Sequence, residues 1–394
     1  MTLNFSKNAP VVVIGGGFGG LTTALSLSSC KERPSIILIE PRPRFVFLPL
    51  LYELLSGEME SWEVAPSYPT LLATRGIVLI DELVENIDLD GEVILTSSGQ
   101  VINYSQLVIS TGSSVDSFGI QGVQDHALMF NKFEDVRTVK KLIERLNKSQ
   151  KLNQNIVIVG AGPTGVELAC KVADLLVNPR LVHLIECGER VLINGKSFNQ
   201  EQVEQALKKK SVKVHLNTRV LKITETNLEI QNVTPKNSEP YLLSHAGVVW
   251  TAGVKPCVPS GLPQSLLKDG KILINSKLQV LGYDNVFSIG DIALDLEQPS
   301  LGTAQVAMQQ GELLAQNIMA LIENKALTAF RFADRGEMLS MGIGEATITG
   351  MGLTVSGSTA FQIRRIAYLS KFPDLSLTIR SAGSWLLNYG KNFI

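Results

Sequence analysis

Cysteine, histidine and long apolar runs are scarce in this chain of 394 residues. The four cysteines stand far apart without a CxxC pair, and there are only four histidines, so neither a disulfide framework nor a metal site is indicated. Unpaired cysteines are typical of a reducing compartment. No apolar run reaches the roughly 18 residues of a spanning helix, and the first ten residues lack the pattern of a signal or transit peptide. We therefore expect neither a transmembrane helix nor a cleaved leader.

Net charge is also nearly absent, because 36 basic residues face 37 acidic ones. This balance argues against nucleic acid as a main partner. Apolar residues make up 45% of the chain and charged residues 19%, which excludes disorder and suits a well-packed α/β protein. The length exceeds what one hydrophobic core usually serves, so we expect two domains and an appendage.

One unit of sequence occurs twice in the chain. VVVIGGGFGG (residues 11–20) and IVIVGAGPTG (residues 156–165) each show a β-branched strand that leads directly into G-x-G-x-x-G. A second apolar strand follows each copy and ends on an acid, Glu40 or Glu186, about 20 residues after the third glycine. This context of strand, glycines, helix and acid predicts a dinucleotide-binding turn and makes a chance match improbable.

The three glycines of such a turn have separate physical roles. The first allows a tight turn, the second lets a pyrophosphate approach the backbone, and the third lets helix and strand pack closely. The phosphates then contact free N–H groups at the N-terminus of the helix. Two copies therefore predict two bound dinucleotides.

A third motif predicts which nucleotide each copy binds. NVFSIGDIA (residues 285–293) resembles the last FAD motif of the two-dinucleotide-binding flavoprotein superfamily, whose aspartate, here Asp291, contacts the ribityl and phosphate part of FAD. Asp291 could instead, or in addition, cap a helix. The first copy is thus the predicted site of non-covalent FAD, since no cysteine or histidine stands near it for attachment. Its candidate residues are Gly15, Gly17, Phe18, Gly19, Gly20, Glu40, Pro41, Thr111, Gly112, Gly290 and Asp291.

The second copy is the predicted site of NADH or NADPH. Glu186 should accept hydrogen bonds from the adenosine ribose hydroxyls and repel a 2′-phosphate, which favours NADH. Arg190, four residues later, could offset this preference by turning inward. The candidate residues are Gly160, Gly162, Pro163, Thr164, Gly165, Glu167, Glu186, Arg190, Ala252 and Gly253.

The predicted fold is α/β, with two Rossmann-like dinucleotide-binding domains, the second inserted in the first. The FAD domain takes residues 1–115 and 280–330, and the NAD(P)H domain takes 150–275. Residues 331–394 form a C-terminal interface or membrane-anchoring region.

The apolar segment FVFLPLLYEL (residues 45–54) stands where disulfide reductases of similar plan carry a redox-active cysteine pair. It fits an apolar electron acceptor, or it is core under a loop. FLPLLY (47–52) and GTAQVAMQQG (302–311) resemble motifs of the type II NADH dehydrogenases, the single-subunit, non-pumping NAD(P)H:quinone oxidoreductases. With the glycine motifs, this resemblance covers nearly all of residues 10–330.

The resemblance implies that hydride passes from NAD(P)H to FAD and that two electrons then pass to a membrane quinone. It implies that Glu167 lies near flavin and nicotinamide, and that the backbone of Ala304 and Gln305 lies near the flavin pyrimidine. Glu167 could also be a buried hydrogen-bond acceptor, and Gln305 and Gln309 could share a solvated helix face. The implied quinone contacts are Pro49, Tyr52, Gln305, Met308 and Gln309.

The C-terminal tail is basic, with five basic residues and one acid from residue 351 onward, a net charge of +4. An apolar stripe at helical spacing, flanked by Arg380 and Lys391, predicts a helix on an anionic membrane surface, or one packed on the core or on a dimer partner. The protein would then be peripheral to the plasma or thylakoid membrane, facing the cytoplasm or stroma. The stripe consists of Ala382, Trp385, Leu386, Tyr389 and Phe393.

The tail departs from the tryptophan-rich ending of many bacterial members of the family. This departure favours the cyanobacterial and plastid branch, which includes demethylphylloquinone reductases and implies a naphthoquinone. Three other functions remain open: a reductase of an iron–sulfur carrier, a sulfide:quinone reductase, which needs cysteines at the flavin, and a redox sensor of the apoptosis-inducing-factor type.

Overall fold

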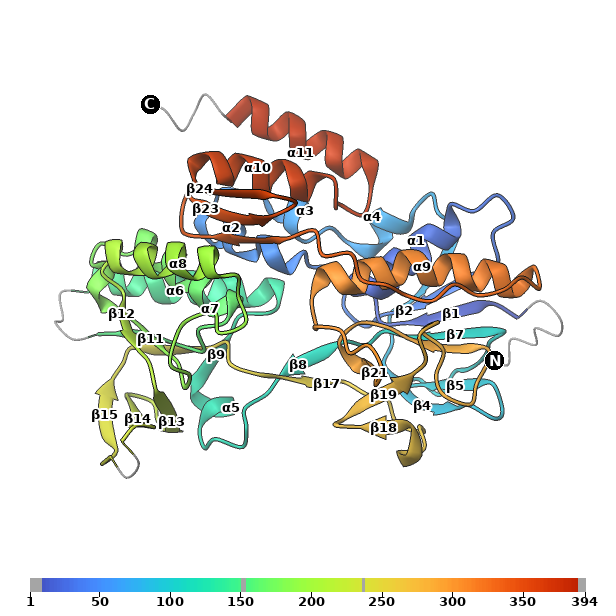
Figure 1. Ribbon diagram of the computed structural model, residues 1–394, viewed down its shortest axis with the longest axis horizontal. Coiled ribbons are helices and arrows are strands. Elements are labelled where there is room, and N and C mark those ends of the chain that lie inside the picture. The colour runs from blue at the N-terminus through green and yellow to red at the C-terminus, as the bar shows by residue number, and fades with distance from the viewer. Residues whose placement is uncertain (1–8, 150–153, 236–237, 389–394) are drawn as a thin grey trace. The chain divides into compact units, whose positions relative to one another are not determined.

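The computed structural model describes residues 9–149, 154–235 and 238–388 (Figure 1). The chain divides into two compact units, each assembled from three segments. The first unit contains Met1–Phe45, Pro66–Ser114 and Lys255–Ala333. The second contains Val46–Ala65, Val115–Val254 and Asp334–Ile394.

The first unit is built on a five-stranded parallel sheet with strand order β20-β7-β1-β2-β3. Its central strands VVVI and IILI are buried throughout, as β-branched runs are when helices cover both faces of a parallel sheet. The strands are β1 (Val11–Ile14), β2 (Ile36–Ile39), β3 (Ile77–Ile80), β7 (Gln106–Ile109) and β20 (Val286–Ser288).

Two helices, α1 (Phe18–Ser28) and α9 (Ala304–Ile322), lie side by side in the first unit (Figure 1). Their close approach depends on Gly311, where an added Cβ would stand 2.6 Å from the carbonyl oxygen of Gly19. A larger residue at position 311 would force the helices apart.

Smaller elements complete the first unit. They are helix α4 (Tyr68–Leu72), the 3₁₀ turns η3 (Gln264–Leu266) and η4 (Gly290–Ile292), the antiparallel sheet of β4 (Val84–Asp88), β5 (Val93–Thr96) and β6 (Val101–Asn103), and the sheet of β18 (Leu267–Lys268), β19 (Lys271–Ile274) and β21 (Ala293–Asp295). Two of the places where the chain passes from one unit to the other lie in β8 (Ser113–Val115) and β17 (Val254–Pro256), which pair with each other.

The second unit repeats the plan with a parallel sheet of order β12-β11-β10-β16-β9. Helix α6 is amphipathic, and its buried residues recur at spacings of three and four. The elements are β9 (Ala127–Met129), α6 (Phe133–Lys148), β10 (Ile156–Val159), α7 (Pro163–Leu175), η2 (Pro179–Leu181), β11 (Val182–Ile185), α8 (Ser197–Lys209), β12 (Lys213–His215) and β16 (Gly247–Trp250).

An antiparallel sheet and α5 pack on this parallel sheet of the second unit. Val157, Ile185 and Trp250 from the parallel strands share one buried cluster with Leu228 and Ile230. The elements are α5 (Val123–His126), β13 (Thr218–Ile223), β14 (Asn227–Asn232) and β15 (Tyr241–Ser244).

The unit boundaries differ from the segment 150–275 predicted for the second domain. The middle segment of the second unit, Val115–Val254, begins earlier because β9 pairs with β16, and it ends earlier because β19 pairs with β21 in the first unit.

The C-terminal part of the second unit consists of a three-stranded antiparallel sheet and two helices. The apolar segment around Phe47 lies in this unit, where Phe47 is 2% exposed and its ring lies 5.5 Å from Tyr368 and 5.6 Å from Phe372. The elements are η1 (Leu48–Leu50), α2 (Leu51–Ser56), α3 (Ser61–Val64), β22 (Glu337–Ser340), β23 (Ala346–Gly350), β24 (Leu353–Gly357), α10 (Ser358–Leu369) and α11 (Leu375–Asn388).

Among the described residues, no helix combines the length and the apolar character needed to cross a membrane.

Candidate active site

Backbone contacts restrict two of the three fingerprint positions in the first glycine turn to glycine. Gly15 has a φ of 93°, and a Cβ there would stand 2.5 Å from the carbonyl oxygen of Ser110. A Cβ on Gly20 would stand 2.0 Å from the carbonyl oxygen of Gly15. Gly17 differs, because its Cβ direction opens into space with no atom within 4 Å.

The open space at Gly17 lies where a phosphate would approach. Gly17 is the N-cap of α1, and the first helical bond runs from Leu21 N to Gly17 O. The N–H groups of α1 that come before Leu21 can therefore bind an anion. The residues present therefore fit the pyrophosphate of a dinucleotide.

Glu40 lies at the carboxyl end of β2 and is 1% exposed. Its carboxylate accepts hydrogen bonds from Gly16 N at 2.7 Å and from Arg42 Nε and Nη2 at 2.7 and 2.6 Å. Burial alone raises the pKa of Glu40, but the Arg42 and Gly16 hydrogen bonds outweigh it and hold the pKa below its ordinary value. Glu40 is thus a fixed anion that can accept bonds from ribose hydroxyls.

The remaining predicted flavin residues lie in the same unit. Ser113 Oγ donates to Asp291 Oδ2 at 2.5 Å, and Thr111 Oγ1 donates to Cys257 O at 2.5 Å. Asp291 lies in η4, while Thr303 caps α9 by accepting from Val306 N at 3.2 Å. Asp291 therefore caps neither of these helices, because the N-cap of α9 is Thr303 and the N-cap of η4 is Ile289.

The second glycine turn repeats this geometry in the second unit. Gly160 has a φ of 100°, and a Cβ there would stand 2.9 Å from Ala252 Cα. A Cβ on Gly165 would stand 1.8 Å from Gly160 O, whereas Gly162 again faces open space. Pro163 occupies the first turn of α7, where a missing N–H costs nothing.

Glu186 holds the second turn as Glu40 holds the first. Its carboxylate accepts from Ala161 N and Gly188 N, both at 2.7 Å. Arg190 Nη2 lies 3.9 Å from Glu204 Oε1, in a half-exposed ion pair. The two carboxylates thus differ, since Glu40 accepts from the Arg42 guanidinium in addition to backbone amides, whereas Glu186 accepts from two backbone amides.

A buried cluster of charges surrounds Glu167 in the second unit. Glu167 Oε1 accepts from Ser340 N at 2.7 Å and from Arg364 Nη2 at 3.3 Å. Arg364 is fully buried, also pairs with Glu53 through Nη1, and donates to Pro49 O at 2.7 Å. Burial raises the pKa of Glu167 to about 7, and the charge of Arg364 opposes that rise.

The predicted quinone contacts divide between the units. Pro49 and Tyr52 lie in the second, where the buried Tyr52 ring stands 5.6 Å from Phe130. Gln305, Met308 and Gln309 lie on α9 in the first, where Gln309 Nε2 donates to Ala333 O and Gln309 Oε1 accepts from Ala333 N, both at 3.0 Å. Gln309 is therefore already bonded through both amide atoms.

The C-terminal helix α11 carries part of the predicted stripe within the described residues. The ring of Trp385 lies under the Arg365 guanidinium at 4.1 Å, and Arg380 stacks on Trp62 at 4.5 Å. Leu375 and Ile379, which are 71% and 63% exposed, precede Ala382 at spacings of four and three and so extend the predicted stripe toward the start of the helix. The predicted stripe residues Tyr389 and Phe393, the flanking Lys391 and the side chain of Leu386 lie outside the described part of the structure.

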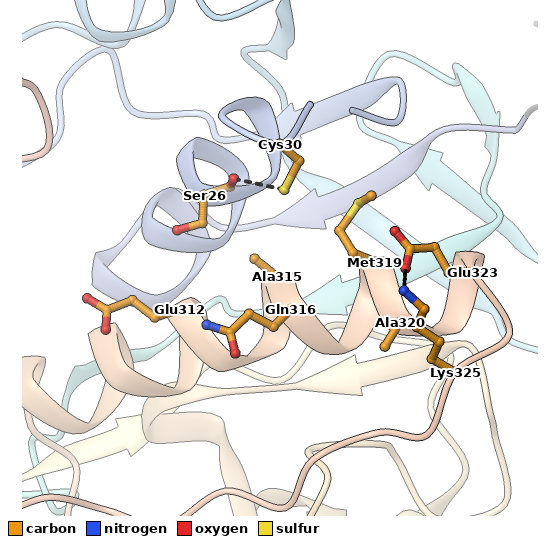
Figure 2. Close-up of a pocket in the computed structure, with 9 residues that line it drawn as sticks. All are labelled: Ser26, Cys30, Glu312, Ala315, Gln316, Met319, Ala320, Glu323 and Lys325. Atoms are coloured by element: carbon orange, nitrogen blue, oxygen red, sulfur yellow. Dashed lines mark hydrogen bonds and ion pairs between the residues drawn. The ribbon is translucent and has the colours of Figure 1, made fainter. Parts of the chain in front are cut away.

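A groove of about 630 Å³ runs between α1 and α9 (Figure 2). Cys30 Sγ donates to Ser26 O at 3.5 Å on one side, and Lys325 pairs with Glu323 at 2.5 Å on the other. None of its nine lining residues is a predicted site residue. Within the described residues, no group of three or more His, Cys, Asp or Glu side chains could hold a metal ion.

Three charged residues of the site were not predicted. They are Arg42, which pairs with Glu40, and Arg364 and Glu53, which pair with each other beside Glu167. Arg42 could have been found from its position two residues after Glu40. Arg364 carries no comparable signal, because its partner Glu53 is 311 residues away in the chain.

Residues 9–311 match the family model of the pyridine nucleotide-disulphide oxidoreductases. The chain belongs to this family. It is 34% identical over 400 residues to a demethylphylloquinone reductase of Synechocystis, with 96% of this chain and 98% of the relative covered. It is 32% identical to an alternative NAD(P)H-ubiquinone oxidoreductase of Arabidopsis thaliana, with 96% and 81% covered.

A solved structure, NDH2 from Plasmodium falciparum in complex with NADH, superposes with a TM-score of 0.85 at 16% identity and covers 97% of this chain and 98% of that one. The superposition confirms the predicted α/β fold class. The predicted resemblance to the type II NAD(P)H dehydrogenases is confirmed by the relatives.

Proposed function

We propose that the protein is an NAD(P)H:quinone oxidoreductase with FAD in the first unit and NADH in the second. The observation that carries this proposal is the pair of glycine turns, each with open space at its middle glycine and a carboxylate bonded to its backbone. The quinone reductases among the relatives support the same activity. Bound FAD supplies the chemistry by accepting hydride from NADH and passing two electrons to the quinone.

The residues of the first unit bind and orient FAD. The amides at the start of α1 would donate hydrogen bonds to the pyrophosphate, Glu40 would accept from the ribose, and Asp291 would hold the ribityl side. The backbone of Ala304 and Gln305 would hold the pyrimidine side of the flavin. The two units are thus the FAD and NADH domains of the proposed enzyme.

Glu167 is proposed to hold a proton near neutral pH, because burial and Arg364 together place its pKa at about 7. Below that pH the carboxyl group is protonated and can donate, and above it the group accepts. Pro49, Tyr52, Gln305, Met308 and Gln309 are the proposed quinone contacts, and a naphthoquinone such as demethylphylloquinone is the proposed substrate.

The test of this function is an assay of purified protein with NADH against a benzoquinone and a naphthoquinone. We expect a yellow protein that releases FAD on acid precipitation and reduces both quinones. A ferredoxin- or rubredoxin-type carrier reduced in place of quinone would instead favour the iron–sulfur alternative. A folded but colourless protein would contradict the proposal.

Glu186→Ser is expected to raise the use of NADPH relative to NADH several-fold. Removing the carboxylate removes its repulsion of a 2′-phosphate, which at short range contributes about 1 kcal/mol or more. The ratio of kcat/KM values for the two nucleotides measures the change. Glu201→Ser, on the exposed surface of α8, is the control and should leave the ratio unchanged. An unaltered ratio in Glu186→Ser would remove Glu186 from the role of selector.

Glu167→Gln is expected to remove an inflection near pH 7 from the kcat profile for quinone reduction. The wild-type rate should change through pH 7 because the Glu167 carboxyl titrates there, whereas an amide does not. Glutamine keeps the oxygen that accepts from Ser340 N. Steady-state rates between pH 5 and 9 provide the measurement, and a variant with an unchanged inflection would assign that titration to another group.

We propose further that the protein is a peripheral membrane protein at a plasma or thylakoid membrane, on the side of the cytoplasm or stroma. The alternative role of its C-terminal region is to form the contact of a homodimer. The exposed Leu375 and Ile379 beside Arg380 support an apolar contact with a basic flank. Arg380 near an anionic surface contributes about 1 kcal/mol, a part that salt screens.

Replacing both Leu375 and Ile379 by serine is expected to reduce binding to anionic liposomes at least tenfold, since each apolar side chain contributes about 1.5–3 kcal/mol when fully buried. Reduction of short-chain quinones in solution should continue. Leu242→Ser is the matched control, because Leu242 is 67% exposed on β15 of the same unit. Co-sedimentation with liposomes measures the effect. Equal sedimentation of the double variant and wild type would rule out this face.

A further inference from the structure

Phe118 combines two unusual properties in the second unit. Its side chain is 61% exposed, and its backbone has a φ of 50°. Bulky residues seldom adopt this left-handed conformation. Such strain persists only where the surroundings enforce it, and it concentrates at functional sites.

Asp116 enforces the conformation through three hydrogen bonds. Its N–H donates to Gly253 O at 3.2 Å, and its carbonyl oxygen accepts from the Trp250 indole at 2.9 Å. Its carboxylate oxygen Oδ1 accepts from Phe118 N at 2.8 Å. The turn that carries Phe118 is therefore anchored at the carboxyl end of β16.

The Phe118 ring rests on Gly253. Gly253 has a φ of 68°, and a Cβ added there would stand 2.2 Å from Phe118 Cζ. The preceding residue, Ala252, contacts the first glycine of the second turn, Gly160. The exposed ring is thus linked to the glycine turn of the proposed pyrophosphate site through Gly253 and Ala252.

The order of the strands places the ring on a particular side of that site. A dinucleotide lies across the carboxyl ends of the strands, with its adenosine ribose at the acid that ends the second strand. That acid is Glu186 on the β11 side of β10, while Phe118 lies on the β16 side. The other half of the dinucleotide therefore extends toward Phe118.

We propose that Phe118 is a binding residue for the nicotinamide half of NADH, with its ring forming an apolar wall for the nicotinamide nucleotide. The inference rests on the proposed function of the second unit. A flat ring covered by a ligand explains why a phenylalanine is held exposed at a strained position. Ring stacking of this kind corresponds to a change in affinity of about twofold to tenfold.

The test compares Phe118→Gly with Phe118→Tyr in the full FAD-loaded protein. Glycine accepts a φ of 50° without strain, so the Gly variant should keep its flavin and its melting temperature while losing the ring. The dependence of anaerobic flavin reduction on NADH concentration gives the apparent Kd, and ADP-ribose, which lacks nicotinamide, is used as a competitor. We expect the Kd for NADH to rise about twofold to tenfold in Phe118→Gly, with the Ki for ADP-ribose unchanged and Phe118→Tyr close to wild type.

Two outcomes would overturn the inference alone: an unchanged Kd for NADH in Phe118→Gly, or an equal loss of affinity for NADH and ADP-ribose. Phe332→Gly, at a 40% exposed phenylalanine of the first unit, should leave the Kd unaltered. A wild-type flavin that NADH fails to reduce would overturn the proposed function and this inference with it.

Discussion

Gly17→Ala should deprive the protein of most of its FAD while leaving its fold intact. The backbone at Gly17 has a φ of −65°, which alanine adopts readily, and the added methyl group meets no protein atom within 4 Å. It would meet the pyrophosphate, which must approach the amides at the start of α1. Losing one or two charge-assisted hydrogen bonds of about 1.5–3 kcal/mol each lowers the affinity for FAD on the order of a hundredfold.

Gly162→Ala is the matched variant in the second unit and separates the two sites. Gly162 has a φ of −70° and the same open surroundings. This variant should purify with full FAD but show a strongly raised KM for NADH. The flavin content per protein measures FAD binding, the melting temperature measures the stability of the fold, and stopped-flow flavin reduction at varied NADH concentration measures NADH binding.

The opposite pattern, in which Gly17→Ala weakens NADH and Gly162→Ala loses flavin, would reverse the assignment of cofactors to units. Normal flavin content and normal NADH kinetics in both variants would contradict dinucleotide binding at these turns. A fall in melting temperature without ligand is not expected for either variant, since both methyl groups point into open space.

Arg364→Met should destabilise the second unit by about 3–5 kcal/mol, because it leaves two buried carboxylates without their cation. Arg364 is fully buried, and Glu53 and Glu167 are 1% and 5% exposed. The variant also loses the bond to Pro49 O, so η1 and α2 lose an attachment to α10. Chemical denaturation gives the free energy of unfolding.

A double variant tests whether the loss arises from unpaired charge. Adding Glu53→Gln to Arg364→Met removes one of the stranded carboxylates, so the double variant should be more stable than the sum of the single effects predicts. Arg190→Met is the control, because its ion pair with Glu204 is half exposed and contributes little. A full-stability Arg364→Met variant, or strict additivity with Glu53→Gln, would show that the cluster is not coupled in this way.

The glycine turns and their acids were predictable from sequence because the glycines and the acid follow one another at fixed spacing within one strand–turn–helix–strand unit. Gly15, Gly20 and Glu40 follow a spacing that the geometry of the turn dictates. The same rule placed Gly160 and Glu186. Close packing of backbone on backbone restricts these positions to few residue types, so the pattern is visible in one sequence.

The charged cluster was not predictable, because tertiary folding alone brings its members together. Arg364 meets Glu53 across 311 residues, and nothing in the local pattern of α10 distinguishes it from Arg365. The stripe on α11 was predicted from spacing alone, and spacing could not reveal that the Arg365 guanidinium stacks on the Trp385 ring. Gln309 was predicted to face quinone, and its bonds to Ala333 show a structural use that a motif cannot reveal.

The most direct test of electron transfer from NADH through FAD to quinone is an anaerobic two-step titration of the purified protein followed by flavin absorbance. The account predicts that NADH bleaches the flavin and that a naphthoquinone then restores its oxidised spectrum, with one quinone consumed per NADH. A flavin that NADH leaves oxidised, or a reduced flavin that quinone fails to reoxidise, would contradict it.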